Sequence, residues 1–275
     1  MNFHTDEWIM ERIKEHYEEA QLYFPKERII GIFYNGSANY GLDCENSDVD
    51  TKCLIVPTIE EVSALKEPVS HTHVRANNEH IDFKDIREYI KTFRKQNLNF
   101  LEILFTKYYI LSENEKYKEI WNELIYRREE ITHFDQVRAI KSMVGIMFNK
   151  YHMAFTSAAA PTFPLGYDTK SFMHIMRVDE YIKKYIAGLS YEQCLKSSQA
   201  EYLKLLKSGH LPLEDAKKMA DEALEIIKIM SDKYTSSVIK EENYTNLINN
   251  ILDEAAYNFI LEAFSKNYSI FDKNE

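Results

Sequence analysis

The chain has 275 residues, of which 45% are apolar, and a formal net charge of −10 at pH 7. The apolar fraction allows a sizeable core and argues against a disordered protein, and the negative charge argues against sequence-blind binding of nucleic acid over a broad surface. The three cysteines form no Cys-x-x-Cys pair, so neither a zinc site nor a disulfide framework is expected. No apolar run approaches the ~18 residues that span a membrane, and the first residues lack the basic start and apolar core of a signal peptide. We therefore expect a cytoplasmic protein with no membrane partner; the sequence leaves its oligomeric state open.

The first 112 residues alternate between helix and strand patterns. A helix is predicted over residues 6–21, because Thr5 can cap it and Asp6 suits the positive end of the helix dipole. Short apolar, β-prone runs predict strands over residues 28–34, 48–56, 70–75, 79–83 and 108–111. Helical patterns separate them over residues 59–66, 84–96 and 98–105. This half is therefore expected to be a mixed α/β unit.

The second half of the chain has a different pattern, because strand signals fade from about residue 113. Helical periodicity covers residues 113–129, 134–156, 169–187, 191–207, 213–234 and 244–265. The strongest break is the Pro-containing segment 158–166. We expect two domains, 1–112 and 113–275, with a ligand site in the cleft between them.

The most informative stretch is Gly36-Ser37, followed after ten residues by Asp48-Val49-Asp50. Successive side chains on a strand point to opposite faces, so Asp48 and Asp50 are expected to share one face. Neighbouring carboxylates repel unless a cation lies between them, and Mg²⁺ binds one or two carboxylates together with substrate phosphates. The stretch favours a Mg²⁺ site. A surface turn followed by a solvated acidic strand end is the alternative.

An apolar strand, Gly-Ser, a short spacer and Asp-x-Asp, in this order, resemble the signature of the DNA polymerase β-like nucleotidyltransferase superfamily. The resemblance implies an α+β fold, in which a palm with a mixed sheet and flanking helices precedes an all-helical C-terminal domain. It also implies a third acidic residue on a neighbouring strand, and Asp82 is its best match. Glu79 and Asp85 are the alternatives if the strand register differs.

Three further segments narrow the resemblance. They are residues 97–105, 166–177 and 201–213. Together with the core motif, they resemble the predicted nucleotidyltransferases of the RNA-repair-pathway polymerase β family, over about residues 28–230.

The segment 166–177 also places three basic side chains on one helix face. Lys170, His174 and Arg177 follow the spacing i, i+4 and i+7. A row of Lys, His and Arg suits the triphosphate of a nucleotide or an RNA phosphate. A solvated basic stripe is the alternative interpretation.

The activity that the resemblance implies is transfer of a nucleoside monophosphate from an NTP to an acceptor hydroxyl, with release of pyrophosphate. In this scheme Asp48, Asp50 and Asp82 are the catalytic acids and hold two Mg²⁺ ions, for which Mn²⁺ is a possible substitute. Gly36 lets the backbone approach the phosphates, and Ser37 offers them a hydroxyl and a backbone N–H.

The acceptor is less defined than the nucleotide site. The resemblance favours an RNA 3′ end. Nucleotidylation of a protein or a small molecule is a second hypothesis, and the acidic net charge mildly favours it. A non-catalytic nucleotide-binding regulatory module is a third, which absence of the third acid would favour. The sequence does not identify the preferred NTP.

Overall fold

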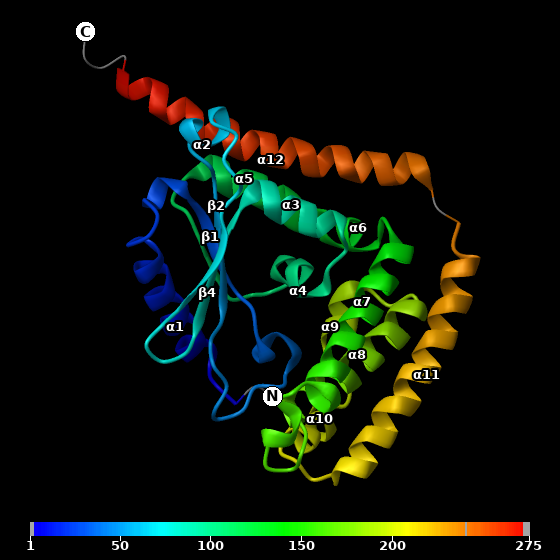
Figure 1. The fold of residues 1–275 in the computed structure, drawn as a ribbon. Coiled ribbons are helices and arrows are strands. Elements are labelled where there is room, and N and C mark those ends of the chain that lie inside the picture. Colours follow the sequence, from blue (N-terminus) through cyan, green and yellow to red (C-terminus); the bar gives the residue numbers. More distant parts are fainter. Residues whose placement is uncertain (1–2, 240, 272–275) are drawn as a thin grey trace.

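The computed structural model describes residues 3–239 and 241–271 and shows a five-stranded sheet joined to a helical half (Figure 1). The strands lie in the order β3-β4-β2-β1-β5. Their bounds are β1 Ile29–Tyr34, β2 Thr51–Ile55, β3 Ser70–Val74, β4 His80–Asp85 and β5 Tyr109–Leu111. Among these strands, β2 and β4 pair in parallel and the other neighbours pair antiparallel. The predicted α+β class with a mixed sheet is confirmed.

The pairing of β1 with β2 brings the two parts of the sequence motif to the same end of the sheet. Tyr34, the last residue of β1, lies opposite Thr51, the first residue of β2. The Asn35 backbone N–H then donates to the Asp50 carbonyl oxygen at 2.9 Å. The turn that starts at Gly36 therefore begins beside the segment that ends at Asp50.

One face of the sheet is covered by α1 (Asp6–Ala20), which stands on the opposite side from the helices that follow the sheet in the chain (Figure 1). The Thr5 side chain accepts a hydrogen bond from the Trp8 backbone N–H, so the predicted cap is confirmed. Ile9 and Ile13 are fully buried against this face of the sheet, and each contributes roughly 1.5–3 kcal/mol relative to an exposed position.

The other face carries the larger core, which continues into the helical half. Helices α3 (Ile86–Arg94), α4 (Leu98–Leu101) and α5 (Glu115–Tyr126) lie on this side, and α12 (Glu242–Phe271) packs across α3 and α5 (Figure 1). A single cluster of buried side chains runs from β1 to Phe259 of α12. The division into domains 1–112 and 113–275 stays a prediction, since the core is continuous across that boundary.

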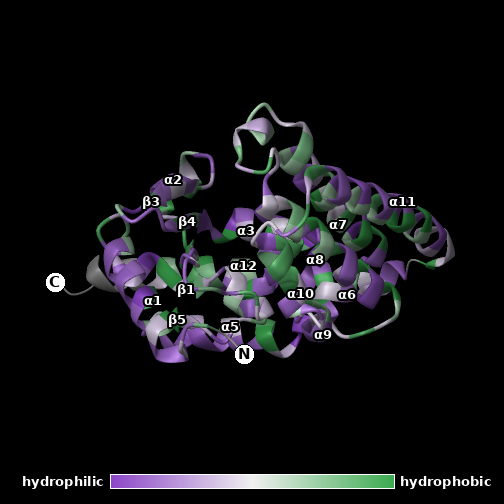
Figure 2. Ribbon diagram, turned by 90° about the horizontal axis from the view of Figure 1, so that it is seen from below, coloured by the Kyte–Doolittle hydropathy of each residue, from purple (hydrophilic) through white to green (hydrophobic). Residues whose placement is uncertain are grey.

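The helical half packs mainly around α8. Its helices are α6 Arg128–His133, α7 Gln136–Tyr151, α8 Thr169–Ile186, α9 Tyr191–Leu195, α10 Ala200–Lys207 and α11 Leu213–Ser237. Helices α7, α9, α10 and α11 all contact α8. Figure 2 shows hydrophilic and hydrophobic residues mixed along α7, α8 and α11, as expected of helices that bury one side. In the described part of the chain, no helix is both long enough and apolar enough to cross a membrane.

The helix predicted over residues 191–207 is wrong as a single element, because the structure breaks it between α9 and α10. The Ser197 hydroxyl donates to one oxygen of the Glu180 carboxylate at 2.6 Å, and the Ser198 backbone N–H donates to the other at 2.7 Å. These contacts give the serines partners outside a helix, which is a known reason for serine to interrupt helical structure. The break fixes where α10 starts and so where Lys207 lies.

Candidate active site

Seven of the eight predicted site residues line one cavity of about 270 Å³ between the end of the sheet and helices α7, α8 and α10. The seven are Gly36, Ser37, Asp48, Asp50, Lys170, His174 and Arg177. The eighth, Asp82, is not part of the lining. The cavity has an acidic wall from the sheet side and a basic wall from the helical side.

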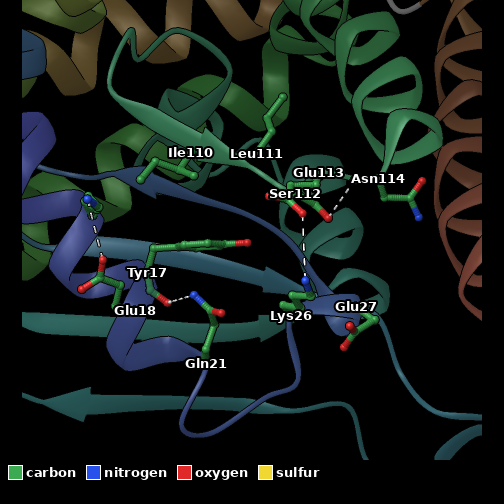
Figure 3. Close-up of a pocket in the computed structure, with 11 residues that line it drawn as sticks. Tyr17, Glu18, Gln21, Lys26, Glu27, Ile110, Leu111, Ser112, Glu113 and Asn114 are labelled. Atoms are coloured by element: carbon green, nitrogen blue, oxygen red, sulfur yellow. Dashed lines mark hydrogen bonds and ion pairs between the residues drawn. The ribbon is translucent and has the colours of Figure 1, made fainter.

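A larger hollow of about 650 Å³ lies elsewhere, between α1 and β5, and contains none of the predicted site residues (Figure 3). Four of its five charged side chains pair with one another: Lys14 with Glu18 and Lys26 with Glu113, both at 4.0 Å. Because both of its cations already have carboxylate partners, this hollow shows no sign of an anion-binding site.

The Gly-Ser turn requires glycine for a reason that the sequence does not reveal. A Cβ atom at Gly36 would lie 2.6 Å from the hydroxyl oxygen of Tyr34 and 2.8 Å from its Cζ. Tyr34 is buried, and its hydroxyl accepts a hydrogen bond from the Ala38 backbone N–H at 3.1 Å, so the ring has little room to move. Ser37 then begins a short 3₁₀ helix, Ser37–Tyr40.

Asp48 and Asp50 form the acidic wall, although they precede β2 instead of lying within it. The predicted strand 48–56 begins only at Thr51. The carboxylate of Asp50 accepts two bonds on Oδ1, from the His80 backbone N–H and from His80 Nδ1, both at 2.9 Å. Between the two aspartates, the Val49 backbone N–H donates to Glu79 Oε1 at 3.2 Å. Asp48 makes no side-chain hydrogen bond to any other described residue.

Five basic side chains form the opposite wall. Lys150 comes from α7, Lys170, His174 and Arg177 from α8, and Lys207 from α10. None of the five forms an ion pair with a carboxylate among the described residues. The contacts that Lys150 and Lys207 make are to sulfur, at 3.7 Å to Met153 Sδ and 3.2 Å to Cys44 Sγ. The three lysines and Arg177 are cations without a carboxylate partner among the described residues, and such cations around a cavity favour an anionic ligand.

The basic wall also sets the charge of its histidine. Burial, followed by the nearby charges of Arg177 and Lys150, lowers the pKa of His174 well below its ordinary value. His174 is therefore neutral at pH 7 and offers a single ring N–H. Burial likewise lowers the pKa of Lys150.

Arg177 is the most buried member of the basic wall, with 5% of its surface exposed. Its guanidinium lies over the Tyr40 ring, 3.9 Å from the ring centroid. The Nε and Nη1 atoms are buried and have no hydrogen-bond partner among the described residues. Buried donors are almost always hydrogen-bonded in proteins, so these two nitrogen atoms indicate a ligand that accepts hydrogen bonds from them.

Glu102 lies beside this arginine and was not among the predicted site residues. It is 1% exposed, lines the cavity and accepts a hydrogen bond from the Tyr40 hydroxyl. With its amide nitrogen turned to the carboxylate, Asn35 donates to Glu102 Oε1 and, at 3.2 Å, to the Asn99 carbonyl oxygen. Burial raises the pKa of Glu102 to about 8, and the charge of Arg177 opposes the rise. An acid inside the apolar run 98–105 was the available sequence signal.

The predicted third acid, Asp82, lies on β4 opposite Lys52 and is not among the residues that line the cavity. Its Oδ2 atom is 3.4 Å from Lys52 Nζ, and its Oδ1 atom accepts a hydrogen bond from the Thr72 hydroxyl at 3.3 Å. Both carboxylate oxygens therefore already have partners within the sheet.

The two alternative acids also have structural partners. Glu79 is 4% exposed and pairs with Arg12 and with Arg75, the latter at 2.9 Å. Asp85 is fully buried and caps α3 by accepting from the Arg87 backbone N–H at 2.8 Å. Within residues 3–239 and 241–271, no three His, Cys, Asp or Glu side chains are grouped to hold a metal ion. Oxygen donors for Mg²⁺ are present at Asp48 and Asp50, which suits an ion completed by substrate phosphates.

Comparison with known proteins identifies a family for this chain. No curated protein matches the sequence. A nucleotidyltransferase-like protein from Exiguobacterium sibiricum aligns with 97% of this chain and 81% of its own, at 10% identity and a TM-score of 0.29, which is too low to support an argument. The sequence model of the RNA repair pathway DNA polymerase beta family matches residues 6–178. This range includes the Gly-Ser turn, both cavity aspartates and the basic face of α8. The chain belongs to this family.

Proposed function

We propose that this member of a nucleotidyltransferase family moves a nucleoside monophosphate from an NTP to an acceptor hydroxyl and releases pyrophosphate. The observation that carries the proposal is the division of one cavity into two walls. Asp48 and Asp50 stand on one side, and five basic side chains without carboxylate partners stand on the other. A magnesium–triphosphate complex complements this arrangement, because its cation can bind the aspartates and its phosphates can bind the basic side chains.

The basic wall binds the triphosphate in this proposal. Lys150, Lys170 and Lys207 supply charge, and Arg177, which lines the cavity, supplies the buried donors Nε and Nη1, which have no partner among the described residues. Arg forms directional, paired hydrogen bonds with phosphate oxygens, whereas Lys acts as a point charge. As the bond between the α-phosphorus and its bridging oxygen breaks, charge builds on the pyrophosphate, where these side chains already stand.

The acidic wall positions the reacting phosphate. Asp48 and Asp50 would hold Mg²⁺, which supplies Lewis-acid polarisation of the phosphoryl group; Mn²⁺ is a reasonable substitute. His80 binds Oδ1 of Asp50 and keeps that carboxylate in one orientation. The acceptor hydroxyl loses its proton to solvent, and its oxygen forms the new bond to the α-phosphorus in line with the departing pyrophosphate.

The acceptor in this proposal is an RNA 3′ end, and the family to which the chain belongs is its support. A protein or small-molecule acceptor remains the alternative, since the net charge of −10 leaves only local surfaces suited to RNA. The two differ in which partner receives label from an NTP.

The test is incubation of the protein with each α-labelled NTP, Mg²⁺ or Mn²⁺, and panels of RNA, protein and small-molecule acceptors. We expect label on RNA 3′ ends with wild type and with Asp232→Asn, an exposed control on α11. We expect none with Asp48→Asn or Asp50→Asn. If only a protein or a small molecule receives label, RNA is not the acceptor and the alternative acceptor is correct. Transfer that survives both cavity substitutions would refute the proposed site, and NTP binding without transfer to any acceptor would favour a regulatory module.

A further inference from the structure

The register of β2 against β4 separates Asp82 from the two cavity aspartates. Lys52 lies directly opposite Asp82, and Thr51 lies opposite Ile81. One step earlier on each side, Asp50 meets His80, whose backbone N–H and Nδ1 both bind the Asp50 carboxylate. The position beside Asp50 on the neighbouring strand is thus held by a histidine, and Asp82 stands two residues farther along.

The side chain that pairs with Asp82 is Lys52, a buried cation for which Asp82 supplies the counter-charge. Lys52 is 6% exposed, and its Nζ atom lies 4.5 Å from the centroid of the Phe100 ring. Asp82 is the carboxylate paired with it among the described residues, at 3.4 Å. Removal of one member of a buried ion pair leaves an uncompensated charge and is strongly destabilising. Release of Asp82 to a metal ion would therefore remove the counter-charge of Lys52.

We propose that the protein holds one divalent cation, through Asp48 and Asp50, and that Asp82 is the counter-ion of Lys52 and not a ligand of a second ion. This inference rests on the proposed function and revises the expectation of two ions that the family resemblance implied. Its support is the strand register, the two occupied oxygens of Asp82 and the exclusion of Asp82 from the cavity lining.

The basic wall makes a one-ion site chemically reasonable. In a two-metal site the ions together stabilise the attacking and leaving oxygens. Here Lys150, Lys170, Lys207 and Arg177 line the same cavity without carboxylate partners among the described residues, so fixed side-chain charges meet the leaving pyrophosphate. The unpartnered Nε and Nη1 atoms of Arg177 independently mark this cavity as an anion site.

The experiment counts bound ions directly. Mn²⁺ is titrated into the 275-residue chain with α,β-methylene ATP, which blocks transfer, and free Mn²⁺ is measured by electron paramagnetic resonance. We expect one Mn²⁺ per chain in wild type and in Asp82→Asn. The dissociation constant should change by less than about twofold in Asp82→Asn, compared with roughly 10- to 100-fold when even an outer partner of a metal ligand is lost.

A second variant keeps the test decisive if Asp82→Asn folds poorly. Lys52→Met/Asp82→Asn removes the pair as a unit and keeps an apolar chain over Phe100, and such replacements are often tolerated. It should also bind one Mn²⁺ per chain. Two ions per wild-type chain, with one lost in either variant, would overturn the inference.

Failure of the proposed function gives a different result. If Asp50→Asn binds Mn²⁺ and α,β-methylene ATP as wild type does, the cavity aspartates are not the cation site and the proposed function itself is wrong. A two-ion count that depends on both Asp50 and Asp82 would leave the proposed function standing and remove only this inference.

Discussion

The guanidinium of Arg177 lies 3.9 Å above the ring of Tyr40 and links helix α8 to the 3₁₀ helix that follows the Gly-Ser turn. The Tyr40 hydroxyl in turn donates to Glu102. These three side chains connect the helical half, the turn and the segment after α4 at one end of the cavity. A nucleotide bound to Arg177 would therefore lie where the two halves of the chain are in contact.

Arg177→Lys should weaken NTP binding and leave the fold intact. Lysine keeps the charge but loses the planar N–H groups that have no protein partner. A hydrogen bond to a charged group contributes about 1.5–3 kcal/mol, so we expect the NTP dissociation constant to rise roughly 10- to 100-fold. Isothermal titration calorimetry with α,β-methylene ATP and Mg²⁺ measures it. An unchanged constant would show that Arg177 does not contact the nucleotide.

Lys150→Met should also weaken nucleotide binding, and the effect should fall as salt is raised. Lys150 lines the cavity, whereas Lys141 on the same helix is exposed and lies outside it. We expect Lys141→Met to bind like wild type at every salt concentration, because screening acts on charges that meet the ligand. Equal effects of the two substitutions would indicate a general surface-charge effect and count against a phosphate contact.

Glu102 should make the protein less stable as pH rises. Its folded pKa of about 8 lies above the ordinary value of about 4.3. The neutral carboxyl is the form that the folded state favours, so stability is highest below pH ~4.3 and falls up to pH ~8. Glu102→Gln carries no titrating group there. Melting temperatures measured from pH 5 to 9 should diverge in favour of the variant, and parallel curves would contradict this assignment.

Glu79 should behave in the opposite way. Burial alone would raise the pKa of Glu79, but hydrogen bonds from His16 and Arg12 outweigh it and hold the pKa far below its ordinary value. The ionised form is favoured in the folded state, so its contribution is present above pH ~4.3 and is lost as pH falls below it. Loss of one partner from a buried ionic pair costs about 3–5 kcal/mol.

Urea unfolding of Glu79→Gln at pH 7 measures that cost. The variant should lose less stability than wild type between pH 5 and pH 3, because the titrating carboxylate is gone. Because Glu79 Oε1 also holds the Val49 backbone N–H, Mn²⁺ affinity should fall as well. A variant as stable as wild type at pH 7 would show that the contacts of Glu79 do not stabilise the fold or hold residues 48–50 in place.

Local patterns predicted much of the fold and of the site. The buried strand β1, the Gly-Ser turn and the aspartate pair follow one another within about 20 residues, and Lys170, His174 and Arg177 share one helix face through helical spacing. Each of these features is formed by residues close together in the chain, so the periodicity of helices and strands is enough to predict it.

The remaining features depend on contacts between distant segments. Lys150 and Lys207 reach the cavity only because α7 and α10 both pack on α8. The position of Asp82 is set by the register of β4 against β2, in which a shift of a few residues decides whether an acid meets Asp50 or Lys52. Glu102 gains its environment from Asn35 and Tyr40 of the Gly-Ser turn and from Arg177 of α8, two segments that are far from residue 102 in the chain.

The central claim is that this cavity binds a nucleoside triphosphate together with a divalent cation held by Asp48 and Asp50. The most direct measurement is the melting temperature of wild type and Asp50→Asn with α,β-methylene ATP, with Mg²⁺, and with both, because a ligand that binds only the folded state raises it. We predict a clear rise for wild type only when nucleotide and Mg²⁺ are both present, and no such rise for Asp50→Asn. Equal rises in the two proteins, or a rise with nucleotide that Mg²⁺ does not increase, would contradict the account.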